Sequence, residues 1–513
     1  MAAIITENFR YENANIFKTD VESGSDKYWL FIGKATPFSV ANDGTGASDS
    51  APPTTYDEVA NNSYYWDDML AAKHIASTDV AFVVPRRNWT ASARYDMYEH
   101  NVSGTNLTYS GVNNIYSSTF YFMTTEYKIY KVLHNGNTGE GSAAAVYSGG
   151  VAPAFTDNSP QFHGGYLLQY VCTISTGDVE KFLTTDFMPI KTNSTVAAAQ
   201  STMGTGRIQS LLVTPGTGYN NGTFYTPIQG DGTNAGTADG AIVKVITSGN
   251  SITAFSSGGT NMHDNLLTKR GGYTYGTINL NNCFSNATLA TPATIHSSPP
   301  VNAIIPIIDP KGGHGSNAPK ELGAHYVMSN TTLSGAEGSG DFNTVNDFRR
   351  VGIVKSPFDY GTTNISATGT KRQTYCVNFA SSSNNFTVDE EIRQASTGAI
   401  GRVVRWDAAN KNLYYQQERH NLYGTNDGTY LTGKKGSYKA FSGTNTITGQ
   451  TSSPTPTGTP STTTGAVGGV TFASGYATPE MAFDSGDILY IENRKPIYRA
   501  TDQTEDVKII VEF

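Results

Sequence analysis

The last residues of the chain alternate between apolar and polar side chains, which is the pattern of a half-buried β-strand. One face takes Val507, Ile509, Val511 and Phe513, and the other takes Lys508, Ile510 and Glu512. Chain ends are usually loose unless they are held by a fold, so this pattern predicts that the final strand pairs inside a sheet. Two short strands over residues 488–492 and 497–500, around the turn "NRKP", are predicted before it.

The first 195 residues mix predicted strands with two short helices. "YYWDDMLAAKH" spaces apolar positions at helical intervals and predicts an amphipathic helix behind an N-cap at Ser63, with a stripe of Trp66, Met69, Leu70 and Lys73. "STGDVEKFLTTDF" predicts a second helix, started by Ser175 or Thr176 with Asp178 in its first turn. "VAFVVP", "FYFM", "YKIYKVL" and "GYLLQYVCTI" predict strands.

Residues 203–290 have a different character. A kernel resembling Gly-x-Tyr-x-x-Gly occurs twice, with Tyr219 matching Tyr273 and Gly222 matching Gly276. Between the copies, "GAIVKVITSGNSITAF" predicts a β-hairpin that turns at Gly249-Asn250. We therefore expect a small β module with a duplicated unit and a core of its own.

Residues 300–375 resemble the first 195 residues in their pattern, with strands predicted in "AIIPIID", "GAHYVMSN" and "FRRVGIVKSP". Residues 383–450 predict successive strands with turns at "STG" and "DAANKN", as in a small β-barrel or sandwich. The Pro, Thr, Gly and Ser run over residues 451–475 predicts a linker that buries no core.

Composition supports a mainly β protein. Charged residues make up only 15% of the 513, while the chain has 53 Gly and 30 Tyr, which suits short strands joined by polar turns. The net charge of −8 favours neither nucleic acid nor an anionic membrane as a partner. The sequence has neither the apolar run of a membrane span nor the pattern of a secretory signal. The three cysteines (Cys172, Cys283, Cys376) are far apart and predict free thiols.

Candidate chemistry is sparse. His314 and His325 with Glu321 fall short of the convergent ligands that a metal site needs, so hydrogen-bonded structural roles are favoured. Acid pairs for glycoside cleavage can be drawn from residues 389–391 or 505–506, but neighbouring acids on a strand alternate faces. We therefore predict no catalytic residue, no metal site, no cofactor and no enzymatic activity.

"VVPRRNW" is more informative, because Arg86, Arg87 and Trp89 cluster where a predicted strand stops. Arginine pairs with carboxylates in a bidentate manner, and Arg and Trp are both enriched in the hot spots of protein interfaces. Composition alone leaves two readings open: an internal ion pair under a loop, or a contact between subunits.

Three segments together resemble a known family: "VVPRRNW" after "WDDMLAAKHI", "FRRVGIVKSP", and the terminal "LYIENRKPIYRATDQTEDVKIIVEF". They resemble the baseplate wedge subunit, the product of gene eight, of T-even-like contractile-tailed bacteriophages. The resemblance covers roughly residues 4–195, 300–375 and 480–513. Residues of the family pattern, carried over by position, are Arg86, Arg87 and Trp89 at the strand end, Glu492, Asn493, Arg494 and Pro496 in a terminal turn, and Asp502, Gln503, Thr504 and Glu505 in the next turn.

The resemblance implies a two-layer β-sandwich core with flanking small sheets, a few short helices and two inserted all-β modules. The core is expected from residues 1–200, 295–378 and 480–513, and the modules from residues 203–290 and 383–450. It also implies a structural, non-enzymatic virion protein of the tail baseplate, assembled in the cytoplasm of the host bacterium. The implied partners are a second copy in a homodimer, other wedge proteins and, at the periphery, tail-fibre or other baseplate proteins.

A second function is kept open beside this one. The inserted modules carry Tyr219, Tyr273, Trp406, Tyr414 and Tyr415, which would bind receptor glycans by stacking if they were exposed together. The period-two spacing in "NLYYQQ" favours burial in the module core instead.

Overall fold

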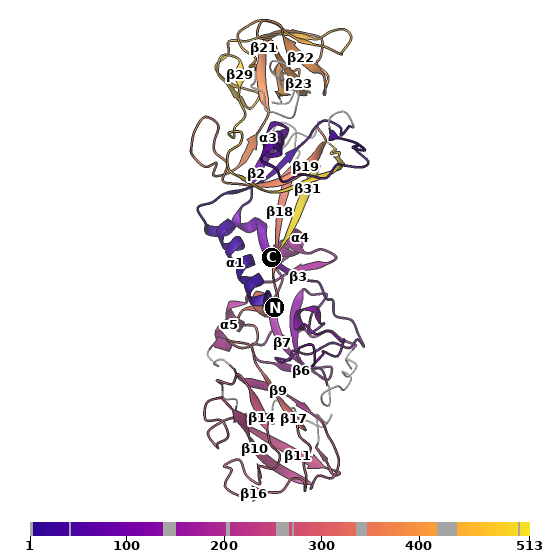
Figure 1. The fold of residues 1–513 in the computed structure, drawn as a ribbon, viewed down its shortest axis with the longest axis vertical. Helices are drawn as coiled ribbons and strands as arrows, with labels where there is room; N and C mark the ends of the chain where they lie inside the picture. Colours follow the sequence, from indigo (N-terminus) through magenta and orange to yellow (C-terminus); the bar gives the residue numbers. More distant parts are fainter. Residues whose placement is uncertain are drawn as a thin grey trace. The chain divides into compact units, whose positions relative to one another are not determined.

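The computed structural model describes residues 4–39, 43–136, 150–201, 206–252, 266–268, 271–334, 346–417, 439–500 and 503–513. The fold is mainly β, as the composition predicted, with several sheets and few helices (Figure 1). The chain forms two compact units. Unit 1 comprises Met1–Ile16, Ala81–Met328 and Ile510–Phe513, and unit 2 comprises Phe17–Val80 and Ser329–Ile509.

A four-stranded antiparallel sheet forms the first core of unit 1. Its order is β4 (Tyr121–Met123), β5 (Lys128–His134), β7 (Tyr166–Thr173) and β6 (Gln161–His163). Aromatic side chains dominate its buried face, including Phe122, Tyr130 and Tyr166. The helices of this unit are short: α4 (Thr176–Phe182), α5 (Ser194–Ser201), α7 (Ala318–Glu321) and the 3₁₀ turn η2 (Ile115–Ser117). The predicted start of α4 is confirmed, since the Ser175 side chain accepts a hydrogen bond from the Asp178 N–H.

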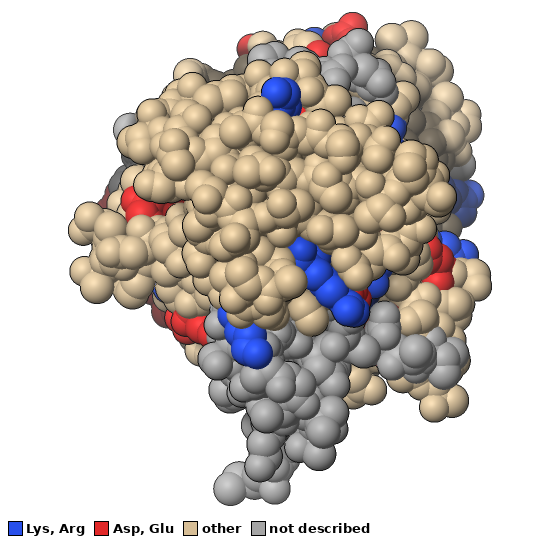
Figure 2. All heavy atoms as spheres, turned by 90° about the horizontal axis from the view of Figure 1, so that it is seen from above, with Lys and Arg blue, Asp and Glu red and all other residues tan. Residues whose placement is uncertain are grey.

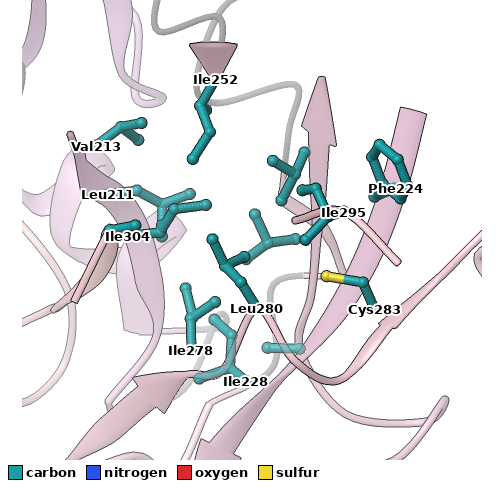
Figure 3. Packing of buried hydrophobic residues seen from close by; sticks show 14 of the residues in the cluster. Leu211, Val213, Phe224, Ile228, Ile252, Ile278, Leu280, Cys283, Ile295 and Ile304 are labelled. Carbon is teal, nitrogen blue, oxygen red and sulfur yellow. The ribbon is translucent and has the colours of Figure 1, made fainter. Parts of the chain in front are cut away.

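A second core of unit 1 lies between residues 208 and 308 (Figure 3). Its sheet has the order β12 (Ser251–Ile252), β11 (Ile242–Ser248), β10 (Gly222–Gly230), β15 (Cys283–Phe284) and β16 (Pro292–Ala293), with β13 (Leu266–Thr268) on β11 and β14 (Gly276–Ile278) on β10. The predicted hairpin is confirmed: Ser248 pairs with Ser251 across Gly249 and Asn250, both at positive φ.

A two-stranded sheet connects these two cores. It consists of β9 (Ile208–Val213) and β17 (Ile304–Ile308). Leu212 and Ile307 belong to the aromatic core beside β5 and β7. Leu211 and Ile304 belong to the core of the 208–308 segment. Because side chains alternate along a strand, this sheet is buried on both faces and joins the segment firmly to the rest of unit 1.

A five-stranded antiparallel sheet forms the first core of unit 2. Its order is β20 (Thr370–Arg372), β2 (Met69–His74), β1 (Tyr28–Gly33), β19 (Phe348–Lys355) and β30 (Asp487–Ile497). α3 (Val59–Asp67) precedes β2, and the 3₁₀ turn η1 (Ser77–Asp79) follows it. Trp29, Phe31 and Met69 are fully buried in the core of this sheet.

A closed barrel of six strands is the second core of unit 2. The strands follow one another as β24 (Asn412–Gln416), β23 (Ala399–Asp407), β22 (Glu391–Gln394), β25 (Ile447–Gly449), β26 (Thr457–Pro460) and β21 (Tyr375–Ser383), and β21 also pairs with β24, which closes the ring. β29 (Tyr476–Ala477) adds to β21, and β27 (Gly465–Val467) pairs with β28 (Val470–Phe472). The barrel therefore takes in strands on both sides of the 383–450 segment in which a barrel or sandwich was predicted.

The final strand, β31 (Thr504–Glu512), does pair within a sheet, as predicted. That sheet has the order β31, β18 (Tyr326–Ser334), β3 (Val80–Pro85) and β8 (Phe187–Pro189). Val507 and Ile509 are buried while Ile510 is exposed, in agreement with the alternation in the sequence. The boundaries between the two units fall inside α1 (Glu7–Ser23), β18 and β31, and at the start of β3.

Three local predictions were wrong. The helix expected over residues 64–74 stops at Asp67, and residues 69–74 form β2, because pairing with β1 overrides the helical spacing. Ser63 lies inside α3, whose N-cap is Glu58. The turn expected at "NRKP" is part of β30, which pairs with β19 on both sides of it, with Asn493 opposite Arg350, Ile497 opposite Phe348 and a register shift between them. The linker expected over residues 451–475 contains β26, β27 and β28, and β26 is a strand of the barrel.

Candidate functional site

The family-pattern residues after β3 are integrated into unit 1. The backbone of Arg87 accepts a hydrogen bond from the Met123 N–H at 2.7 Å, and the Trp89 N–H donates to the Met123 carbonyl at 2.8 Å. The chain after Pro85 therefore runs along β4. The half-buried Trp89 packs against the aromatic core behind that strand.

The two arginine side chains are held by neutral oxygens of the protein. Arg87 donates to the Tyr116 carbonyl at 3.0 Å and lies over the Tyr121 ring at 4.4 Å. Arg86 donates to the Thr184 carbonyl at 2.8 Å and to Asn88 Oδ1 at 3.0 Å. Both side chains are half-buried, and their positions are set by these internal hydrogen bonds.

The C-terminal family-pattern residues lie in unit 2 and serve different local roles. Asn493 accepts a hydrogen bond from Arg350 Nε at 2.9 Å and donates to the Pro53 carbonyl at 3.0 Å. Arg350 also binds the buried Asp68 carboxylate and lies over the Tyr65 ring at 4.6 Å. Burial raises the pKa of Asp68, and the Arg350 charge opposes that shift. Asn493 therefore ties β30 to a buried ion pair.

The remaining residues of that group make separate local contacts in β30, in β31 and in the turn between them. Glu492 accepts from the Tyr490 hydroxyl at 2.6 Å and pairs with Arg494 at 3.4 Å, in a contact that is almost half exposed. Pro496 lies in β30. Glu505 lies in β31 and approaches Arg499 at 3.4 Å. Gln503 closes the turn before β31 by accepting a hydrogen bond from the Ala500 N–H. Asp502 lies outside the described residues.

A buried cluster of charges in unit 1 went unrecognised in the sequence. Lys131, in the middle of β5, has a side chain only 1% exposed, and its Nζ lies 3.0 Å from Glu321 Oε2. The ammonium also lies 4.2 Å from the centre of the Tyr98 ring. Both Glu321 oxygens accept from the Gly315 N–H, and Oε1 also accepts from the Asn317 N–H at 3.1 Å. A lysine inside a sequence that reads "YKIYKVL" gives no local sign of such burial.

The cluster continues to the two ends of the 208–308 segment, where it connects to the rest of unit 1. His314 Nε2 lies 3.1 Å from Asp309 Oδ1, and Gln209 Nε2 donates to Asp309 Oδ2 at 2.7 Å. Arg207 lies 3.7 Å from the same carboxylate. Burial and the Lys131 charge hold the pKa of His314 below its usual value, although Asp309 opposes the shift. Within the part of the chain that the structure describes, no three His, Cys, Asp or Glu side chains are grouped to hold a metal ion.

The carboxylates considered for glycoside cleavage diverge. Glu390 is buried and accepts from the N–H groups of Thr387, Thr451 and Ser452. These hydrogen bonds outweigh burial and lower the pKa of Glu390. Glu391 pairs at the surface with Arg393. The first of these acids therefore organises a loop, and the second forms an exposed ion pair.

The aromatics considered for glycan stacking are mostly core residues. Tyr219 and Tyr273 are 1% and 2% exposed, and Tyr414 and Tyr415 are 8% and 2% exposed. Trp406 is half-buried against the barrel core. These five side chains form no exposed stacking platform. The structure therefore argues against glycan binding by stacking on them.

Comparison with known proteins agrees with the resemblance seen in the sequence. The family described as "Bacteriophage T4, Gp8" matches residues 3–152. Residues 3–152 are thus similar to the Gp8 family. The baseplate wedge protein gp8 of Enterobacteria phage T4 is 30% identical over 103 residues, which are 20% of this chain and 30% of the T4 protein. The matched part of the chain therefore covers less than a third of the length of the T4 protein.

The region similar to Gp8 includes Arg86, Arg87 and Trp89, and it ends before β6 and the 208–308 segment. Glu492, Asn493 and the other C-terminal pattern residues lie outside it, so their family roles stay predictions. None of the helices among the described residues has the length and apolar character needed to cross a membrane.

Proposed function

We propose that the chain is a structural subunit of a contractile-tail baseplate wedge, located in the virion. The observation that carries this proposal is the Gp8-family match over residues 3–152, which includes the Arg86–Trp89 strand end. The T4 relative is named a baseplate wedge protein. The architecture of unit 1 is compatible with a load-bearing role, because the β9–β17 sheet joins two of its cores and the Lys131–Glu321 ion pair is buried within it.

The proposed partners are a second copy of the chain and neighbouring wedge proteins, with tail-fibre proteins at the periphery. In this role the protein links wedge subunits and takes part in the rearrangement of the baseplate when the tail contracts. Arg86 is the best candidate contact of the first family-pattern group, because its half-buried side chain is held in place by Thr184 and Asn88. A side chain that is already ordered loses little entropy on binding.

Light scattering of the purified chain, alone and with the other wedge proteins of the same virion, tests this proposal. We expect a species of twice the 54.9 kDa chain mass that takes up those partners into a defined complex. Arg86→Ala should weaken assembly about tenfold or more if Arg86 is a hot spot. Arg94→Ala, at an exposed arginine of the same unit that contacts Tyr109, is the matched control. A monomer that ignores every wedge protein would refute the assignment.

A further inference from the structure

The first helix of the chain turns polar side chains inward and large apolar side chains outward. In α1, drawn in indigo in Figure 1, Phe9 is 58% exposed and Ile16 is 66% exposed. Ile4 and Ile5, which precede the helix, are 86% and 69% exposed. A surface helix normally turns its apolar stripe toward the core and its polar residues toward water. The outward side of α1 is therefore unusually apolar.

The inward side of this helix is held firmly by unit 1. Arg10 Nε donates a hydrogen bond to the Phe513 carbonyl at 2.6 Å, and the Arg10 guanidinium also pairs with Glu512. Tyr11 is buried, and its ring stacks on Phe82 with the ring centres 5.6 Å apart. The outward side chains are thus presented from a fixed helix, and a partner that binds them meets an ordered surface at little cost in conformational entropy.

The exposed side of α1 is large enough to anchor a partner. Its four large apolar side chains, each more than half exposed, present roughly 500 Å² of apolar surface, and patches of that size on monomers are often interaction sites. One partner in a standard interface buries about 800 Å², a little over half of it apolar. The outward side of α1 therefore supplies about the apolar area that one side of such an interface needs.

The spacing of the outward residues favours a helix as the occupant. Phe9, Glu12 and Ile16 are separated by three and four positions, and all three are exposed. These are the intervals between the a and d positions of a heptad, at which one helix packs against another. Residues at this spacing form a row along a single side of a helix, and that row matches the side of a second helix.

Glu12, in the middle of this row, discriminates between kinds of helix. Its side chain is 52% exposed, although Oε1 lies 3.1 Å from Lys320 Nζ. Two copies of α1 that used both Phe9 and Ile16 across a twofold axis would bring their Glu12 carboxylates together, and like charges at such a contact are unfavourable. Lys or Arg on a different helix would form an ion pair there. The charge therefore favours a helix of another protein over a second copy.

A shortage of charge alone does not identify such a surface. No Asp, Glu, Lys, Arg or His occurs between Lys439 and Glu480 in unit 2. Figure 2, seen from the barrel end of Figure 1, shows charged side chains scattered singly over a broad surface. Among the described residues from 375 to 477, however, Val388 is the single large apolar side chain that is exposed. The barrel lacks the apolar anchors that α1 presents.

We propose that the outward side of α1, together with Ile4 and Ile5, binds an amphipathic helix of a partner protein that carries Lys or Arg opposite Glu12. Phe9 and Ile16 are the central apolar contacts, and the two isoleucines extend the surface beyond the start of the helix. This surface is independent of the proposed wedge function.

The test uses the full chain and, as the probe, a stapled helical peptide of about three heptads with Leu at its a and d positions and Arg at the central d position. A second probe carries Glu in place of that Arg. Fluorescence anisotropy measures the Kd of each probe. We expect saturable binding of the Arg probe, at least about fivefold tighter than the Glu probe, because only Arg attracts Glu12. Glu12→Arg should reverse this order of affinity.

Two matched double variants locate the site. Phe9→Gln/Ile16→Gln replaces the central apolar side chains with good helix formers and should weaken binding of the Arg probe at least about tenfold. Val151→Gln/Val301→Gln replaces two exposed apolar side chains elsewhere in unit 1 and should leave the Kd unchanged. The proposal is overturned if neither probe binds, if Glu12→Arg leaves their order unchanged, or if both double variants behave alike. A dimer that Phe9→Gln/Ile16→Gln dissociates, seen by light scattering, would overturn it too, since the occupant would then be a second copy.

Discussion

The Lys131–Glu321 pair offers the sharpest test of how unit 1 is held together. The two side chains are 1% and 5% exposed and lie 3.0 Å apart. Replacing one member of a buried ion pair leaves the other charge without a counter-ion, which typically costs about 3–5 kcal/mol. In Lys131→Met the apolar stem is retained, so the loss reports mainly on the charge. The Glu321 carboxylate would keep its Gly315 and Asn317 hydrogen bonds but lose its cation.

That free energy corresponds to a large shift in melting temperature. For a unit of this size, each kcal/mol lowers Tm by roughly 2–4 °C, so a drop of about 10 °C is expected. Differential scanning calorimetry measures it, and hydrogen exchange over residues 312–321 should rise most, because the Gly315 and Asn317 amides in that stretch bind Glu321. The matched control is Lys128→Met on the same strand. Lys128 forms an exposed ion pair with Glu126, so its replacement should lower the free energy of unfolding by less than about 1 kcal/mol.

A double variant separates charge from packing. Lys131→Met/Glu321→Gln removes both charges, and we expect it to be less destabilised than the sum of the single variants, by about 2 kcal/mol. Additive effects, or a Lys131→Met shift no larger than that of Lys128→Met, would refute the reasoning.

Three further predictions follow from particular side chains. Ile509→Ala should cost about 2–4 kcal/mol and Ile510→Ala less than 1, measured by denaturant unfolding, because only Ile509 is buried; equal losses would argue against the β31 register. The pKa of His314 is lowered in the folded state, so the unfolded chain binds more protons, and stability should fall as pH drops through about 6.5. His314→Gln, which keeps a donor for Asp309, should flatten the dependence of Tm on pH. An unchanged slope would show that another titrating group causes the pH dependence. Arg87→Ala should destabilise unit 1 by about 1–3 kcal/mol, because the Tyr116 carbonyl loses its donor; an unchanged Tm would contradict the internal role.

Much of the local structure could be predicted because neighbouring residues decide it. The Gly249-Asn250 hairpin follows from a turn that needs two positive φ values, and the start of α4 follows from the Ser175 cap. The absence of charge from residues 440–479 is also visible in the sequence. What it could not disclose is that this run lies beside residues 381–387.

The candidate site residues divide in the same way. Arg86, Arg87 and Trp89 were recognisable as a group because they follow one another at the end of a strand. Lys131 was not, since its partner Glu321 is 190 residues away and both look like ordinary surface charges. The acids at 389–391 were equally ambiguous until the structure showed Glu390 turned inward and Glu391 turned outward.

The sequence by itself determined the mainly β character, the alternation of the last strand, the local turns and the resemblance to the Gp8 family. Only the tertiary structure decided that residues 69–74 are a strand, that β30 continues through "NRKP", and that the presumed linker supplies a barrel strand. Each of these depends on pairing with a distant partner: Met69 with Gly33, Asn493 with Arg350, and Thr457 with Ser383. Local propensity differs by about 1 kcal/mol or less per residue, so hydrogen bonds and burial supplied by a distant strand readily overrule it.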